Sequence, residues 1–314
     1  MIRQRTIREK VACTGVGLHT GRPIQLELLP APVDNRVTFV RTDMASHAEL
    51  RAHVQNVADT TLATTLAAGV NGSRAQVGTV EHLLAALAGL GIDNVRVLLN
   101  GPEVPVLDGS AKPFVEMLMS AGIEEQRKSK RFLVVRRDVK VLDGEKLARL
   151  SPGPGFHITC SLDFDHPLIP PTPFKLEFSD GTFRREVASA RTFGFLGDVE
   201  ALQARGLARG GSLANAIVID HYRVLNPEGL RFPDEFVRHK VLDAIGDLSL
   251  FGMPIIGKVQ LKRSGHALNT KLVKTVLSDP RNYEVVEPRE SELACAELGE
   301  KSPFAVFEPI ESVA

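Results

Sequence analysis

The feature that most restricts the fold of this chain is one segment, FVRHKVLDAIGDL at 236–248. Its many apolar residues are typical of a helix that is buried along much of its surface. Yet His239, Asp243 and Asp247 recur every four residues, so the same helix carries three polar side chains along one side. Because burying unpaired charge is costly, these side chains need partners. A bound zinc ion would be one such partner.

A second segment, TVEHLLAAL at 79–87, places further polar groups on an apolar helix. Thr79 predicts the N-cap of this helix. Catalytic zinc sites commonly hold three protein ligands and leave one position for water. His82, His239 and Asp243 would form such a set. The two segments together predict a metal site built from distant parts of the chain.

Each of these residues also has a simpler interpretation. His82 can be a core or capping histidine, and the pair His239 and Asp243 can be a surface pair one helical turn apart. Glu81 can simply favour the helix dipole. The apolar flanks of both segments favour a metal site, since a surface pair does not need them. The zinc-protease motif HExxH is absent, but Glu81 still stands beside a ligand, where a general base acts in that motif.

Three further pieces would complete a hydrolytic site. His266 follows an expected strand and could act as a general acid, with Asp247 as its orienting carboxylate. Thr192 lies in the loop ARTFGF and could donate a hydrogen bond to an oxyanion. Lys240 could stabilise negative charge. A loop packed on the core and a solvated lysine are the alternatives.

Composition limits the class of protein. The chain has 314 residues, enough for two domains, and 38 basic residues balance 38 acidic ones. A neutral chain without Trp is not expected to bind nucleic acid. Cys13, Cys160 and Cys295 form no CxxC pair, which favours a reducing cytosol. No signal peptide or membrane-spanning run is recognisable, so we expect a soluble, cytoplasmic protein.

The order of expected elements suggests two related α+β domains, 1–126 and 127–283, because each half reads as strands, helix, strand and helix. The basic run at 126–131 predicts a solvated linker between them. Residues 284–314 predict an acidic, loosely ordered tail. The main expected helices are 79–88, 114–121, 198–204 and 233–251. The main expected strands are 94–99, 132–141, 156–164, 174–178, 216–219 and 256–261.

The motifs resemble those of the UDP-3-O-acyl-N-acetylglucosamine deacetylase family, the zinc amidase of lipid A biosynthesis. Seven strings match in order over about residues 1 to 278: GVGLHTG (15–21), TVEHLLAALAGLGIDN (79–94), PVLDGS (105–110), SARTFGF (189–195), GGSLANAIV (210–218), the run 230–248, and SGHALN (264–269). Seven ordered strings are far more specific than any single metal motif.

The resemblance implies a set of roles. Zinc, or iron in the cell, would be held by His82, His239 and Asp243. The catalytic residues would be Glu81 as base, His266 as acid or electrostatic partner, Asp247 behind His266, and Thr192 and Lys240 at the oxyanion. Ala63 stands where some members carry a Cys, which removes a possible extra inhibitory metal ligand.

The resemblance also implies the architecture and the substrate. Two similar domains would each layer a sheet against helices, with the active site at their interface. An inserted motif in the second domain would line an apolar passage for an acyl chain, and 193–196 and 217–223 are the candidate walls. The candidate substrate contacts are His19, Phe193, Phe164 at the uracil or sugar, and Lys262 or Arg263 at the diphosphate.

These expectations combine into one hypothesis: a monomeric zinc amidase that removes acetate from UDP-3-O-(3-hydroxyacyl)-N-acetylglucosamine, without nucleic acid and without stable membrane insertion. Two alternatives stay open. A non-catalytic binding protein could use the same metal to hold a nucleotide sugar, although it would need neither Glu81 nor His266. A zinc hydrolase of another amide is the other; the HxE…PCxxC signature of nucleobase deaminases is absent.

Overall fold

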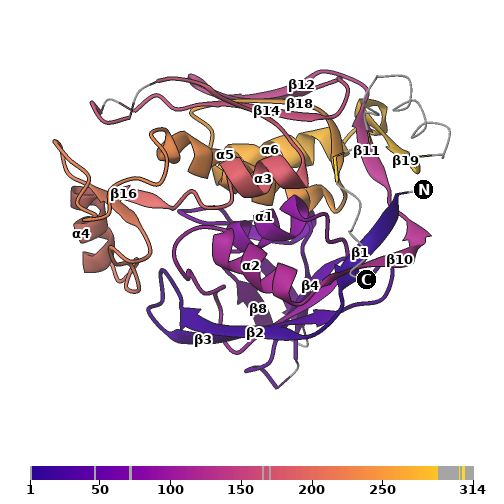
Figure 1. Ribbon diagram of the computed structural model, residues 1–314, viewed down its shortest axis with the longest axis horizontal. Helices are drawn as coiled ribbons and strands as arrows, with labels where there is room; N and C mark the ends of the chain where they lie inside the picture. Colours follow the sequence, from indigo (N-terminus) through magenta and orange to yellow (C-terminus); the bar gives the residue numbers. More distant parts are fainter. Residues whose placement is uncertain are drawn as a thin grey trace.

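The computed structural model describes residues 2–45, 47–70, 73–164, 166–169, 171–288, 304, 306 and 307. The fold is α+β, as expected, and Figure 1 shows its layers. One sheet, which includes β12, β14 and β18, lies at the top of this view, and another, which includes β2, β3 and β4, lies at the bottom. Helices from both halves of the chain fill the space between them.

The first half of the chain is built on a five-stranded sheet with the order β2-β3-β9-β4-β5, a three-stranded sheet β6-β7-β8 and a pair β1-β10. Its elements are β1 (Arg3–Ile7), β2 (Val11–Val16), β3 (Pro23–Pro30), β4 (Val37–Arg41), β5 (Glu49–Arg51), the 3₁₀ turn η1 (Val54–Asn56), β6 (Val57–Asp59), β7 (Thr65–Val70), β8 (Ser73–Val77), α1 (Glu81–Gly89), β9 (Val95–Leu99), α2 (Lys112–Ser120) and β10 (Ile123–Ser129).

The second half is built on a seven-stranded sheet in which β18 pairs with β11, β13 and β14. Its elements are β11 (Phe132–Val135), β12 (Val139–Asp143), β13 (Lys146–Ser151), β14 (Phe156–Ser161), β15 (Phe174–Glu177), α3 (Asp180–Glu186), β16 (Phe193–Phe195), α4 (Leu196–Ala204), β17 (Ile217–Ile219), α5 (Glu235–Leu248), η2 (Ser249–Phe251), β18 (Ile255–Lys262), α6 (His266–Leu277), η3 (Pro280–Asn282) and β19 (Tyr283–Val286).

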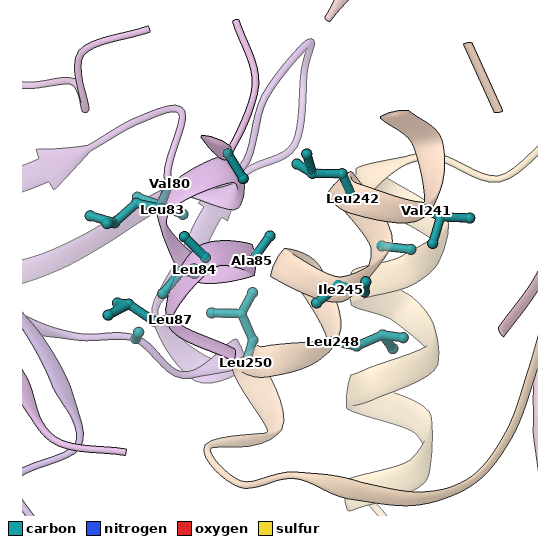
Figure 2. Close-up of a cluster of buried hydrophobic side chains, with 14 of the residues drawn as sticks. Val80, Leu83, Leu84, Ala85, Leu87, Val241, Leu242, Ile245, Leu248 and Leu250 are labelled. Atoms are coloured by element: carbon teal, nitrogen blue, oxygen red, sulfur yellow. The ribbon is translucent and has the colours of Figure 1, made fainter. Parts of the chain in front are cut away.

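Helices α1 and α5 lie side by side (Figure 2), between the two sheets (Figure 1). Leu84 and Leu87 of α1 and Ile245 and Leu248 of α5 are buried between and around them. The close approach requires Gly246, because a Cβ there would lie 2.8 Å from the carbonyl carbon of Glu81 and 2.9 Å from its Cα. The first turn of α1 is therefore held directly against the middle of α5.

The start of α1 differs from the expectation for Thr79. Val80 occupies the cap position without a side-chain cap, and Thr79 adopts a φ of 55°. The Thr79 hydroxyl donates instead to Oε1 of Glu103, at 3.0 Å. The same carboxylate accepts from the backbone N–H groups of His19 and Thr20, at 2.9 and 3.0 Å. A buried charged acceptor thus takes the hydroxyl away from the helix end and ties the loop with His19 to α1.

The prediction of a solvated linker at 126–131 is wrong at Lys130. The predicted domain boundary falls inside β10, which pairs with β1. Lys130 is fully buried, and its Nζ lies 2.7 Å from Oδ2 of Asp93 and 2.7 Å from the carbonyl of Gly91. A basic run looks solvated locally, but here a carboxylate distant in sequence provides the partner that burial requires.

The tail predicted from residue 284 begins inside a strand. Residues 283–286 form β19, which pairs antiparallel with β11. Phe304 and Val306 are buried, and the Phe304 ring packs edge-on against Phe132, with centroids 5.3 Å apart. The chain is therefore ordered at these positions. The rest of the predicted tail, 289–303, 305 and 308–314, lies outside the described residues.

Candidate metal centre and active site

The structure brings the three predicted ligands together. His82 extends from the first turn of α1, and His239 and Asp243 lie one turn apart on α5. Nε2 of His82 is 3.5 Å and Nε2 of His239 is 3.2 Å from Oδ1 of Asp243. One ligand atom from each residue lies within 4.8 Å of the other two, and all three residues are buried. The two imidazoles meet edge to face, with centroids 5.0 Å apart.

The protonation states of this trio suit a divalent cation. Nδ1 of His239 lies 3.1 Å from the carbonyl of Ala190, so it is the donor nitrogen and Nε2 carries the lone pair towards Asp243. Burial lowers the pKa of His239 to about 3, which keeps the imidazole neutral. Burial alone would raise the pKa of Asp243, but the Lys240 ammonium, which donates to its Oδ2, holds it well below its usual value. Two imidazoles and a carboxylate are a donor set that zinc accepts.

Glu81 and His266 lie next to the trio. Oε1 of Glu81 is 3.9 Å from Nε2 of His266, and both side chains are largely buried. Burial raises the pKa of Glu81, although nearby His266 and His82 act against this shift. Burial would lower the pKa of His266, but the carboxylates of Asp247 and Glu81 outweigh burial and raise it to about 10. The site therefore pairs a carboxylate that binds a proton more readily than usual with a protonated imidazole.

Asp247 orients this imidazole and is itself fully buried. Its Oδ2 lies 2.9 Å from Nδ1 of His266 and accepts from Nδ2 of Asn269 at 2.9 Å. Its Oδ1 accepts from the hydroxyl of Thr64 at 2.6 Å. Asn269 and Thr64 were not identified from the sequence as site residues. Asn269 lies in SGHALN, three residues after His266 on what is now α6, and that spacing was the available signal; Thr64 gave none.

Lys240 and Thr192 occupy different surroundings. Nζ of half-buried Lys240 donates to Oδ2 of Asp243 at 2.8 Å and lies 5.7 Å from the centre of the Phe193 ring. Burial would lower the pKa of Lys240, but Asp243 raises it above its usual value, so the ammonium stays charged. Thr192 follows Ala190 by two residues, and its backbone is fixed between Gly109 and Ile217. Lys240 is thus at the site itself, and Thr192 is on the segment before β16 that also carries Ala190, the partner of His239.

The predicted aromatic contacts form one cluster. The Phe164 ring meets Phe193 and Phe195 edge-on, with centroids 6.0 and 5.7 Å apart, and Phe193 packs against Phe236 of α5 at 5.0 Å. Phe193 also lies 6.2 Å from the ring of His239. Strands β16 and β17 pair in parallel, which joins the two segments expected to form passage walls. They and α4 lie at one side of the molecule (Figure 1).

The polar candidates for substrate binding lie at different places in the structure. Arg263, Phe164 and Lys240 all line one pocket, and Arg263 is paired there with Asp163 at 2.7 Å. Lys262 lies on the exposed face of β18 and does not line this pocket. His19 is held by Glu103, and both of its ring nitrogens are buried without a hydrogen-bond partner among the described residues.

The comparisons with known proteins agree with this geometry. The family model LpxC: UDP-3-O-acyl N-acetylglycosamine deacetylase matches residues 4–278. The chain belongs to this family. It is 56% identical over 296 residues to the UDP-3-O-acyl-N-acetylglucosamine deacetylase of Myxococcus xanthus (strain DK1622), covering 94% of this chain and 93% of that protein. The protein of the same name from Teredinibacter turnerae (strain ATCC 39867 / T7901) is 47% identical over 315 residues and covers 100% of both chains.

A further relative is the UDP-3-O-acyl-N-acetylglucosamine deacetylase of Anaeromyxobacter sp. (strain Fw109-5), which is 56% identical over 283 residues, or 90% of this chain and 91% of that protein. The shared region includes α1, α5 and the start of α6, which carry the buried trio, Glu81 and His266. Among the described residues, no helix combines the length and the apolar character needed to cross a membrane.

Proposed function

We propose that this protein is a zinc-dependent amidase that removes acetate from UDP-3-O-(3-hydroxyacyl)-N-acetylglucosamine in the committed step of lipid A biosynthesis. The observation that carries the proposal is the juxtaposition of three buried metal-binding side chains with Glu81 and His266. Family membership gives the substrate class. The intact Glu81 and His266 argue against a purely binding protein, because holding a ligand requires neither.

His82, His239 and Asp243 would hold the zinc, and iron could replace it in the cell. When bound, zinc acts as a Lewis acid that lowers the pKa of water from 15.7 to about 7. Nδ1 of His239 donates to the backbone carbonyl of Ala190, and this hydrogen bond sets the orientation of the imidazole ring. Glu81 and His266 lie beside these ligands and would meet a water held there.

The two residues divide the proton transfers. Glu81 accepts the proton of the attacking water, and its raised pKa brings the carboxylate closer to the range in which a general base works best at neutral pH. His266 keeps Nδ1 on Asp247 and presents Nε2 towards Glu81. The Nε2 proton is therefore the one available to the leaving glucosamine nitrogen. A base and an acid held 3.9 Å apart can serve the two ends of one amide hydrolysis.

Lys240 and Thr192 would stabilise the oxyanion that forms at the acetyl carbonyl. The Lys240 ammonium is already at the site, and its raised pKa keeps its charge at neutral pH. Thr192 is carried by the segment that also orients His239. Preorganised donors of this kind contribute about 3–4 kcal/mol each to lowering the barrier.

The aromatic cluster would receive the substrate beside this centre. Phe193 and Phe164 would contact the nucleotide sugar and the entrance to the apolar passage formed with β16 and β17. Arg263 would contact the diphosphate from the shared pocket, and Lys262, on the outer face of β18, would act only at longer range. His19 has free ring nitrogens among the described residues, and they would bind a substrate hydroxyl.

We further propose that the enzyme is a monomer in the cytoplasm and binds its acylated UDP-sugar from solution. Light scattering on the purified protein tests the monomer directly. A mass of two or more chains would contradict it.

Acetate release from the acylated UDP-sugar, measured with bound metal in the same samples, tests the activity. We expect His82→Ala to lose metal and turnover together. Glu81→Gln and His266→Gln should keep the metal but lose at least about 100-fold in kcat, as is usual for general acid–base groups. Glu116→Gln, at an exposed ion pair of α2, is the matched control and should turn over normally. Near-normal turnover by Glu81→Gln would show that the base is another group.

A further inference from the structure

Thr64 contacts both halves of the catalytic machinery. Its backbone N–H donates to Oε2 of Glu81 at 3.0 Å, and its hydroxyl donates to Oδ1 of Asp247 at 2.6 Å. Thr64 is fully buried and immediately precedes β7, whereas Glu81 is on α1 and Asp247 is on α5. One residue thus joins the proposed base to the carboxylate behind the proposed acid, His266. The two contacts come from different atoms of Thr64 and can be separated by mutation.

We propose that Thr64 is a positioning residue that fixes the base and the acid relative to each other. This inference rests on the proposed function, because it assumes that Glu81 and His266 move the protons. Thr64 acts on Glu81 through its backbone and on His266 through its hydroxyl and Asp247. It does not line the pocket with Phe164 and Arg263.

The hydrogen-bond inventory of Asp247 shows why the hydroxyl matters. An ionised carboxylate only accepts, so every partner must be a donor. Oδ2 takes His266 and Asn269, and the Asn269 carbonyl is already engaged by the hydroxyl of Ser264 at 2.6 Å. Thr64 is the side-chain donor to Oδ1 among the described residues. Without it, a fully buried oxygen loses its partner, and the carboxylate is free to rotate away from His266.

The backbone around Thr64 explains how it can hold α1. The carbonyl of Thr64 accepts from the N–H of Val80 at 3.3 Å, so Thr64 contacts two consecutive residues at the start of α1. β7 and β8 form the hairpin between these two points of the chain. Helix α1 begins without a side-chain cap, and Thr64 supplies the contacts that fix its first turn.

Thr64→Val tests the hydroxyl, since valine keeps the shape and the N–H of threonine but cannot donate to Asp247. We expect kcat for acetate release to fall about 10- to 100-fold, because a misoriented His266 loses part of the roughly 100- to 10,000-fold contribution of a general acid. KM should change little, because Thr64 does not contact the substrate pocket. Thr64→Ser, which restores the hydroxyl, should recover most of kcat. The zinc content should stay at the wild-type level in both variants.

Thr65→Val is the matched control, because this neighbouring hydroxyl bonds to neither carboxylate among the described residues; it should leave kcat unchanged. A double-mutant cycle provides the second measurement. If Thr64 acts through Asp247, then Thr64→Val adds little further loss in an Asp247→Asn background. Additive losses, or wild-type kcat in Thr64→Val, overturn the proposal, and so does a Thr64→Ser variant that folds but is inactive.

If Thr64→Val does not fold, Thr64→Ala can take its place in the test. Thr64→Ala introduces no added bulk and should show the same loss of kcat as valine, so the comparison of Ala with Ser replaces that of Val with Ser. The two proposals also fail in different ways. If the wild-type enzyme releases no acetate, the proposed function fails; if it does and Thr64→Val matches it, only the role of Thr64 fails.

Discussion

Gly246→Ala adds one methyl group at the closest approach of α1 and α5. The new Cβ would lie 2.8 Å from the carbonyl carbon of Glu81 and 2.9 Å from its Cα. Non-bonded carbon atoms pack at about 3.5–4.0 Å, so the two helices must separate locally by about 1 Å. Overpacking of this kind costs about 1–3 kcal/mol, and the better helix propensity of alanine returns about 1 kcal/mol. The net loss in the free energy of unfolding is therefore about 0–2 kcal/mol.

The expected loss of activity is larger than this loss of stability. The displaced residue is Glu81, and a shift of about 1 Å in a reacting group can cost about 100-fold in rate. Urea unfolding and acetate release, measured on the same preparation, separate the two effects. We expect a folded protein with bound metal and about 100-fold lower kcat.

Gly197→Ala on α4 is the control, because a Cβ there meets nothing within 4 Å. This variant should be as active as the wild type and no less stable. If Gly246→Ala keeps wild-type kcat, the close contact does not position Glu81, and our reasoning about this interface is wrong. If it unfolds instead, the contact is a stability determinant with no separable catalytic effect.

Three further predictions concern charge, pH and metal. Lys130→Met should lower the free energy of unfolding by about 3 kcal/mol in urea, because a buried carboxylate loses its cation, whereas Lys128→Met at the exposed surface should change it by less than about 1 kcal/mol. Since the pKa of His266 is raised to about 10, kcat/KM on the alkaline side should fall only as the pH rises through about 10. Asp247→Asn should move that fall to lower pH. An alkaline limb that stays in place in this variant contradicts the prediction. Dialysis against a chelator should lower Tm, and adding zinc at 1,000 times its Kd should raise the free energy of unfolding by about 4 kcal/mol. In thermal melts of His82→Gln, zinc should no longer raise Tm.

The sequence was sufficient to predict the central helix and the polar side chains along its edge. The period of four in His239, Asp243 and Asp247 on an apolar background predicts one buried helix with a polar edge, and α5 has both features. The segment with His82 was predicted as a helix for the same reason, and the structure places its first turn against that edge. These inferences succeeded because both patterns are local.

The errors arose where a partner is distant in the chain. Lys130 looked like part of a solvated linker, but Asp93 and the carbonyl of Gly91, which are distant in the sequence, explain its burial. Thr64 and Asp247 are 183 positions apart, so no local pattern could connect them. Helix α6 is different, because Leu268, Leu272 and Val276 recur every four residues and are buried. That helical pattern is visible in the sequence, but this helix was not among those predicted.

The interface between α1 and α5 explains how the molecule can bury so many ionisable groups. Apolar residues, including Leu84 and Ile245, occupy part of this interface (Figure 2), and their burial contributes about 1.5–3 kcal/mol each. The polar groups meet at the start of α1, where Thr64 and Gly246 bring the chain close. Each buried carboxylate there has donors within hydrogen-bond distance or a position for a cation. The apolar contacts therefore fix the spacing of the helices, and that spacing holds the proposed metal ligands and the two proposed proton-transfer groups together.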